Sequence, residues 1–545
     1  MLLALQALVA GPARGGAAPA SAVDTFNFAE AARCRLRTGS APDWCRMVVE
    51  TVTGQLTSRE ARFEWWRRTV GLFLGPAAFL VLLLLPLDGL SQDAHRLAGV
   101  VALVVVWWIT EAIPIAATAL AGAALTVVLG VASAQEALAP FASPTIFLFL
   151  GSFILAEAMA VHGLDRRLAF ALLSRRAVRG RPARLRVAIG LTTAAISMWM
   201  SNTATAAMLL PVALGILGAV ATESERRGRA GFLLVLAYSA SIGGIATPVG
   251  TPPNLITIGM LDQLAGRDID FFRWVAVGLP LALAIYGALT LIARWLYPLP
   301  RARGSTETED YTGPTLSAWS RGETNCLVAF SLAVSLWIAP GVVAIVAGPS
   351  SPAYRFVAAR LDEGVVALLA ASLLFVLPVD WKNRAFTITW SHASRIDWGT
   401  ILLFGGGLSL GRMMFTTGLA ELIGKGLVAA SGAESLWAVT AVMAAVAILT
   451  TEVASNTAAT NMLVPVAVAI ASAAGVSPVP PAMAVAFGAS MACMLPISTP
   501  PNAIVYGTGM VPVTAMIKFG VLLDFLSFVA IVAGLRLLCP LLGLV

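Results

Sequence analysis

Long apolar stretches separated by short polar loops run through most of the chain. From residue 70 onward they cover about 70–86, 97–110, 113–134, 144–161, 187–218, 230–262, 274–297, 325–347, 363–379, 399–423, 436–474, 482–510 and 515–543. A helix needs about 20 mostly apolar residues to cross the hydrocarbon core of a bilayer. The pattern therefore predicts an all-α polytopic membrane protein.

Two of these runs have an unusual length and a polar centre. The runs 187–218 and 436–474 are too long for one crossing and short for two, and each has a Ser-Asn-Thr triplet at its middle, at 201–203 and 455–457. Non-helical backbone is tolerated at membrane depth only where protein or a water-filled cavity surrounds it. We therefore expect two re-entrant hairpins whose tips reach the membrane interior.

Two further runs are interrupted by paired prolines. The run 230–262 contains "ATPVGTPPNLI" at 246–256, and the run 482–510 contains "LPISTPPNAIV" at 495–505. Proline has no backbone N–H and its ring clashes with the preceding helical turn. Both helices should therefore be broken near their middle.

Composition narrows the class of protein. Of the 545 residues 58% are hydrophobic and only 12% are charged, against roughly 25% charged residues in a soluble domain. This excludes a soluble enzyme, a disordered chain and a coiled coil. The five cysteines are too scattered for a disulfide framework or a zinc site. The three histidines, His95, His162 and His392, do not form the spacing of an intramembrane metalloprotease, so we expect no enzyme.

The basic residues indicate the topology. Lys and Arg are concentrated in the loops 162–186, 222–229, 294–321 and 382–395 and are sparse in the alternate loops. The basic residues behind the net charge of +7 therefore indicate the orientation of the chain in the membrane and do not indicate nucleic-acid binding. We expect about 11 transmembrane helices, a cytoplasmic N-terminus and an extracytoplasmic C-terminus. The expected parts are a cytoplasmic tail (1–60), a first membrane half (61–297), a cytoplasmic linker (298–324) and a second membrane half (325–545).

The two halves repeat each other. "PTIFLFLGS" from residue 144 matches "GTILLFGGG" from residue 399, and "SNTATAAMLLPVA" from residue 201 matches "SNTAATNMLVPVA" from residue 455. "TPPN" occurs at 251–254 and again at 499–502, so the offsets are 255, 254 and 248. An odd number of crossings separates the copies, which makes the repeat inverted. Inverted repeats with broken helices are typical of secondary transporters whose substrate and ion sites lie near the midplane.

The chemistry of the four motifs favours an anionic substrate. The tips offer hydroxyl and amide donors, and the helices that follow them begin with partial positive charge. Unwound backbone at Thr-Pro-Pro leaves carbonyl oxygens free to bind sodium. None of the four motifs contains Lys or Arg, so co-bound cations should neutralise the anion. This indicates cation-coupled anion uptake, with exchange of one dicarboxylate for another as the alternative.

One charged pair relates the two halves. Glu157 and Arg412 lie inside apolar runs and are separated by the repeat offset of 255. Charge inside a bilayer is costly, so either the two residues form an ion pair near the pseudo-twofold axis, or each finds a partner of its own.

The motifs together resemble a known family. "WWITEAIPIAATAL" (107–120), both "SNTA" tips and both "TPPN" breaks are similar to the divalent anion:sodium symporter family, which is INDY-like and known as solute carrier family 13. The resemblance runs from about residue 62 to the C-terminus. It implies a homodimer in the plasma membrane, the inner membrane of a bacterium, in which a transport domain carrying both hairpins moves by an elevator mechanism against a scaffold.

The resemblance also implies site residues. One sodium ion would be held at the first tip and break, by Ser201, Asn202 and the backbone near Gly250. A second would be held at the other tip and break, by Thr451, Ala454, Asn456 and the backbone from Ser498 to Pro500. The substrate carboxylates would lie between the tips, in contact with Asn202, Thr203, Asn456 and Thr457, and Thr251 and Thr499 would line the pocket.

The function implied is sodium symport of succinate, malate, fumarate or citrate. A sodium-independent dicarboxylate exchanger and a sulfate-type symporter are the alternatives.

Overall fold

The computed structural model describes residues 58–85, 90–173, 182–219, 226–299, 318–348, 350–432 and 434–545. Almost all of the expected tail (1–60) and most of the expected linker (298–324) lie outside the described residues. The described part is helical, apart from one two-stranded sheet, and this confirms the predicted all-α membrane class.

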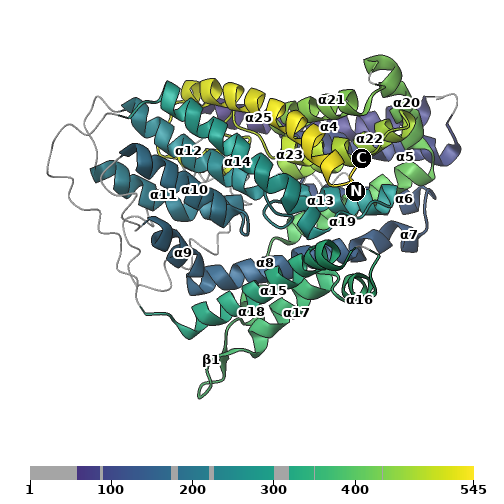
Figure 1. The fold of residues 1–545 in the computed structure, drawn as a ribbon. Coiled ribbons are helices and arrows are strands. Elements are labelled where there is room, and N and C mark those ends of the chain that lie inside the picture. The colour runs from purple at the N-terminus through teal and green to yellow at the C-terminus, as the bar shows by residue number, and fades with distance from the viewer. Residues whose placement is uncertain are drawn as a thin grey trace, which may run out of the picture. The chain divides into compact units, whose positions relative to one another are not determined.

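The first half consists of helices that follow each other with short connections (Figure 1). In chain order they are α4 (Ser58–Leu84), α5 (Gln92–Thr110), α6 (Ile115–Val128), α7 (Ala134–Leu138), η1 (Ala139–Ala142), α8 (Pro144–His162), α9 (Leu164–Leu173), α10 (Pro182–Ser197), α11 (Asn202–Ala219), α12 (Arg226–Gly244), α13 (Pro252–Ala265) and α14 (Phe271–Leu296).

The second half adds a small hairpin of strands. Its elements are α15 (Arg321–Ala347), α16 (Pro352–Arg360), α17 (Glu363–Val376), β1 (Pro378–Asp380), β2 (Ala385–Phe386), α18 (Trp390–Ala393), α19 (Trp398–Thr416), α20 (Leu419–Ser431), α21 (Leu436–Thr451), α22 (Asn456–Ala473), α23 (Val479–Ala489), α24 (Pro500–Gly507) and α25 (Val513–Leu541). The strands pair antiparallel, with Pro378 opposite Phe386 and Asp380 opposite Ala385.

The order of elements in α8–α14 recurs in α19–α25. Each series begins with a long helix that ends at a left-handed glycine, Gly163 with φ 73° and Gly418 with φ 83°. A left-handed residue ends a helix readily when it is glycine, since glycine has no Cβ. The apolar run 399–423 is divided between two helices, because α19 and α20 meet at a bend of 81°.

Seven described helices are long and apolar enough to cross a membrane, or eight if the bent pair of α19 and α20 forms one span. One of the seven is α22, the predicted hairpin arm, whereas α17 and α21 are apolar but shorter. Length and composition therefore do not separate a hairpin arm from a crossing. The expected number of 11 crossings stays a prediction.

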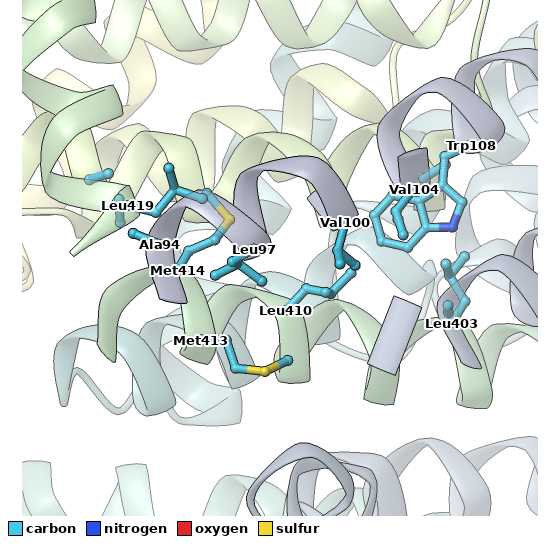
Figure 2. Packing of buried hydrophobic residues seen from close by; sticks show 14 residues of the cluster. Ala94, Leu97, Val100, Val104, Trp108, Leu403, Leu410, Met413, Met414 and Leu419 are labelled. Carbon is cyan, nitrogen blue, oxygen red and sulfur yellow. The ribbon is translucent and has the colours of Figure 1, made fainter. Parts of the chain in front are cut away.

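An apolar core joins α5 to α19 and α20. Its buried side chains include Leu97 and Val100 of α5 and Leu410 and Met414 of α19. Figure 2 shows Val100 next to Leu410, and Leu97 next to Met414. In a bilayer, helices associate mainly through van der Waals packing of such side chains, and close packing keeps α5 and α19 fixed relative to each other.

The ion pair between Glu157 and Arg412, one of the two arrangements that the sequence leaves open, stays a prediction. Arg412 is exposed on α19. Hydrogen bonds from Ser133 and, less strongly, the positive charge of Arg412 lower the pKa of Glu136. Arg412 therefore lies near enough to α7 for its charge to act on Glu136.

A buried ion pair does join two other helices. Arg167 of α9 and Glu323 of α15 approach to 2.7 Å between Nε and Oε1, and their side chains are each 9% exposed. A second contact of 3.2 Å joins Arg167 Nη2 to Glu323 Oε2. Two parallel contacts of this kind fix geometry as well as charge.

Candidate functional site

The first predicted tip is a turn between two helices. α10 ends at Ser197 and α11 begins at Asn202. The Ser197 hydroxyl oxygen lies 2.7 Å from Asn202 Oδ1 and 2.7 Å from the carbonyl oxygen of Ala240 in α12. A hydroxyl group has one hydrogen to donate, so the Ser197 hydroxyl can donate to only one of these two acceptor oxygens at a time.

The second tip has the same construction. α21 ends at Thr451 and α22 begins at Asn456. The Thr451 hydroxyl oxygen lies 2.7 Å from Asn456 Oδ1 and 2.7 Å from the carbonyl oxygen of Ala489 in α23. The two halves therefore match in the hydrogen bonds of their tips as well as in their sequence.

The first break is organised by one buried asparagine. Helix α12 ends at Gly244 and α13 begins at Pro252, and prolines at the first turn of a helix cost no hydrogen bond. The Asn254 Nδ2 donates to the carbonyl oxygens of Gly244, at 2.9 Å, and Thr247, at 2.7 Å. These bonds satisfy carbonyl groups that the interrupted helix leaves without a partner.

The second break is closed in the same way. α23 ends at Ala489 and α24 begins at Pro500. Asn502 Nδ2 donates to the carbonyl oxygens of Ala492, at 2.8 Å, and Leu495, at 3.0 Å. The asparagine of each "TPPN" motif is therefore a structural clamp that holds an irregular loop in one shape.

The first tip and the first break meet at a group of oxygen atoms. The Thr247 hydroxyl donates to the carbonyl of Met198. A Cβ added at Gly250 would lie 2.5 Å from the Gly244 carbonyl oxygen and 2.9 Å from that of Met198. A Cβ added at Gly244 would lie 2.7 Å from Asn202 Oδ1. Glycine at 244 and 250 therefore lets the backbone approach closely enough to gather these oxygens.

The second tip and break meet through an acidic residue. The Ser498 hydroxyl contacts the backbone carbonyl of Glu452 at 3.0 Å and its Oε2 at 2.7 Å. The Glu452 carboxylate also accepts the backbone N–H groups of Met494, at 2.9 Å, and Leu495, at 3.3 Å. Glu452 is 4% exposed, so it ties the tip to the break from inside the protein.

The residues predicted from the resemblance differ in their exposure. Those that are buried are Gly250, Thr251, Thr451, Ala454, Ser498 and Thr499. Those that are half-buried are Asn202, Thr203, Asn456 and Thr457. The side chains of Ser201 and Pro500 are exposed, and the Ser201 carbonyl accepts the Thr205 N–H in the first turn of α11.

The structure adds two residues that the sequence analysis did not name. Ser197 holds Asn202 as Thr451 holds Asn456, and the offset of 254 between the tips leads from Thr451 directly to Ser197. Glu452 is an acidic residue inside the apolar run 436–474, and a charge in such a place is by itself a signal of a functional role.

The two halves interlock around these clusters. The arm α11 of the first hairpin packs against α24, which follows the second break, and α22 of the second hairpin packs against α13, which follows the first break. All four helices begin at a tip or a break. Helix N-termini carry partial positive charge and favour anions, so this arrangement can attract an anion without a fixed cationic side chain.

Comparison with known proteins identifies the family. The family model described as "Sodium:sulfate symporter transmembrane region" matches residues 64–544. A protein of Staphylococcus saprophyticus named sodium-dependent dicarboxylate transporter SdcS is 32% identical over 484 residues, which cover 86% of this chain and 91% of that protein. An uncharacterized transporter of Haemophilus influenzae is 34% identical over 456 residues, 83% of this chain and 93% of that protein.

A solved structure supports the fold. The YdaH transporter of Alcanivorax borkumensis, whose crystal structure is described as revealing an unusual topology, aligns with a TM-score of 0.52 at 15% identity and covers 87% of this chain and 97% of its own. At this identity the likeness concerns the fold alone. The match to the family model over nearly the whole chain, together with the tip and break motifs, shows that the chain belongs to the divalent anion:sodium symporter family of multi-pass membrane transporters.

Proposed function

We propose that this protein imports a C4-dicarboxylate such as succinate, malate or fumarate together with sodium ions. The observation that carries the proposal is the pair of matching oxygen clusters, in which the tip asparagines Asn202 and Asn456 each meet a hydroxyl group that also contacts a helical carbonyl, each contact at 2.7 Å. Each cluster holds more acceptor oxygens than hydrogen atoms to bond them. Such a cluster can bind a sodium ion, because sodium is coordinated by carbonyl and hydroxyl oxygens.

The proposed sodium ligands follow from this geometry and from the resemblance. Asn202, with Ser201 and the backbone at Gly250, would bind one ion. Asn456, with Thr451, Ala454 and the Ser498–Pro500 backbone, would bind the other. Two bound cations would balance a substrate of charge about −2, and this supports sodium coupling because none of the tips and breaks contains Lys or Arg.

The proposed substrate site lies between the two tips. Asn202, Thr203, Asn456 and Thr457 begin the hairpin arms α11 and α22, and their half-buried side chains leave polar atoms for a ligand. Thr251 and Thr499 precede α13 and α24, where they would line the site. The packing of α11 on α24 and of α13 on α22 supports a single shared site.

The transport cycle and the assembly belong to the same proposal. A transport domain that carries both hairpins would move as a unit, in an elevator-type motion, against a scaffold in a homodimer. The N-terminus would lie in the cytoplasm and the C-terminus outside, as the distribution of Lys and Arg indicates.

The test is uptake of radiolabelled succinate into proteoliposomes that contain the purified protein. We expect uptake to require an inward sodium gradient and to be inhibited by unlabelled malate and fumarate. Citrate and sulfate, added as competitors, define the range of substrates. Uptake that is unchanged without sodium, and that is stimulated by dicarboxylate inside the vesicles, would reject symport in favour of exchange. Inhibition by sulfate alone would replace the dicarboxylate by a sulfate-type substrate.

A further inference from the structure

The motif "WWITEAIP" (107–114) lies outside the tips and breaks. Its Glu111 directly follows α5 and has a left-handed backbone, with φ 47°. Residues other than glycine are uncommon in that region, and such strain persists only where the surroundings hold the residue in place. Here the Glu111 Oε2 accepts a hydrogen bond from Arg67 Nη2 of α4, at 3.1 Å. The strained residue therefore serves to hold an arginine.

The Arg67 guanidinium binds groups from three parts of the fold. Besides Glu111, its Nη2 donates to Glu64 Oε2 of the same helix, at 2.8 Å. Its Nη1 donates to the carbonyl oxygen of Ile109 near the end of α5, at 3.3 Å, and to that of Val453, at 3.4 Å. The planar guanidinium can hold several acceptors at once in a fixed geometry. Arg67 thus connects α4, which precedes both repeats, to a residue 386 positions away.

Val453 belongs to the second tip, between α21 and α22. The peptide group that joins it to Ala454 is bonded at both of its polar atoms. The Ala454 N–H donates to the Thr450 carbonyl at 3.0 Å, and the Val453 carbonyl accepts Arg67. This peptide leads directly into Ala454 and Asn456, which are proposed ligands of the second sodium ion. Arg67 therefore helps to fix the orientation of the backbone that enters this site.

Close helix packing brings Arg67 to the tip. A Cβ added at Gly71, one turn after Arg67, would lie 2.0 Å from Thr110 Oγ1, so glycine lets α4 lie directly on the end of α5. Helix α5 in turn packs against α22. The side chains of Arg67 and Glu111 are only 17% and 31% exposed, and hydrogen bonds of charged groups are stronger where water is partly excluded.

We propose that Arg67 is a positioning residue for the second tip and strengthens the binding of sodium there. The proposal rests on the proposed sodium-coupled function. Two carboxylates, of Glu64 and Glu111, balance the charge of the guanidinium, so Arg67 can donate to the tip with little repulsion of a bound cation. Without Arg67 the Val453 carbonyl would lose its donor, and the ion would have to order the tip on binding, which lowers its affinity.

The test compares Arg67→Gln with the unmodified protein in two measurements. The first is succinate uptake into proteoliposomes over a series of sodium concentrations. The second is the increase of the melting temperature of the purified protein with sodium concentration, which reports bound ions without any transport. We expect the sodium concentration for half-maximal uptake to rise by roughly twofold to tenfold, the contribution of one ordinary hydrogen bond. The maximal rate should change little, and the melting temperature should rise less steeply with sodium.

The variant should fold because a second arginine stays beside the same carboxylates. Arg68 Nη2 lies 3.6 Å from Glu111 Oε2, and Arg68 Nε lies 3.8 Å from Glu64 Oε2. If Arg67→Gln nevertheless yields no folded protein, Glu111→Gln decides, because it keeps Arg67 and removes one of the carboxylates that hold it. Glu111→Gln should shift the sodium dependence in the same direction.

Arg96→Gln is the matched control. Arg96 of α5 also donates from Nη1 to a carbonyl at a helix end, that of Leu129 after α6, at 2.9 Å. Leu129 belongs to neither tip nor break. This variant should therefore leave both the sodium dependence of uptake and the melting response to sodium unchanged.

A folded Arg67→Gln protein with unchanged sodium dependence would overturn the positioning role. So would a loss of maximal rate and melting temperature without a shift in half-saturating sodium, since Arg67 would then be structural only, and so would an equal shift in Arg96→Gln. If uptake by the unmodified protein needs no sodium, the proposed function fails, and the melting response to sodium still decides whether Arg67 supports ion binding. An unmodified protein whose melting temperature does not respond to sodium would overturn the role of Arg67 as well.

Discussion

Replacing Gly250 by alanine tests whether the first oxygen cluster is a working sodium site. The added methyl carbon would stand 2.5 Å from the Gly244 carbonyl oxygen and 2.9 Å from the Met198 carbonyl oxygen. Both neighbours are backbone atoms, which cannot move away as a flexible side chain can. The backbone of the tip and of the break must therefore separate, and the proposed ligands of the ion separate with it.

The size of the effect follows from overpacking. Forcing an extra methyl group into a packed site costs about 1–3 kcal/mol. If this cost falls on the sodium-bound form, it raises the sodium concentration for half-maximal uptake by a factor of roughly 5 to 150, at about 1.4 kcal/mol per factor of ten. The maximal rate at saturating sodium should fall much less.

The assay is succinate uptake into proteoliposomes over a series of sodium concentrations, with melting temperature as a check of folding. Gly215→Ala is the matched control, because Gly215 lies in the arm of the same hairpin and an added Cβ there meets nothing within 4 Å. The reasoning is refuted if Gly250→Ala keeps the sodium dependence of the unmodified protein, or if Gly215→Ala shifts it equally.

Three further predictions concern single side chains. Asn202→Ala and Asn456→Ala should each weaken succinate uptake at low concentration by roughly tenfold to a hundredfold, since a hydrogen bond to a charged group contributes about 1.5–3 kcal/mol; normal uptake by either variant would make that tip structural only. Asn254→Ala and Asn502→Ala should each lower the melting temperature, because two buried carbonyl groups lose their donor at about 1–3 kcal/mol each, whereas Asn383→Ala in the exposed β1–β2 turn should not. Glu323→Ala should destabilise the protein by about 3–5 kcal/mol, because it removes the carboxylate that neutralises the buried Arg167 guanidinium. Asp93→Ala breaks an exposed pair and should change the melting temperature little; equal effects of these two variants would reject the assigned burial.

The tips and breaks were predictable because their sequence conflicts with the surrounding pattern. A Ser-Asn-Thr triplet inside an apolar run and paired prolines inside a helix both require irregular backbone. The structure confirms that the helices are interrupted at these places, with α11 and α22 starting at the tip asparagines and α13 and α24 starting at the first proline of each break.

Other features depend on distance in space, which one sequence does not contain. The bend between α19 and α20 is set at Gly418, and a lone glycine in an apolar run does not distinguish a bend from close helix packing. The repeat offset relates Arg412 to Glu157, and the sequence alone does not show that the charge of Arg412 also acts on Glu136 in α7. Arg67 and Val453 are separated by 386 positions, and only the fold brings them into contact.

The hydrogen bonds at the first tip and break also affect the order in which the parts of the chain can fold during synthesis. The bonds of Ser197 to Ala240, Thr247 to Met198 and Asn254 to Gly244 join residues no more than 49 positions apart, and all of them precede Thr451. During synthesis from the N-terminus, the first cluster can therefore assemble while the second half is still being translated. Helix α11 can pack on α24 only when translation is nearly complete. The two halves of the repeat therefore come together only after the first cluster can have formed.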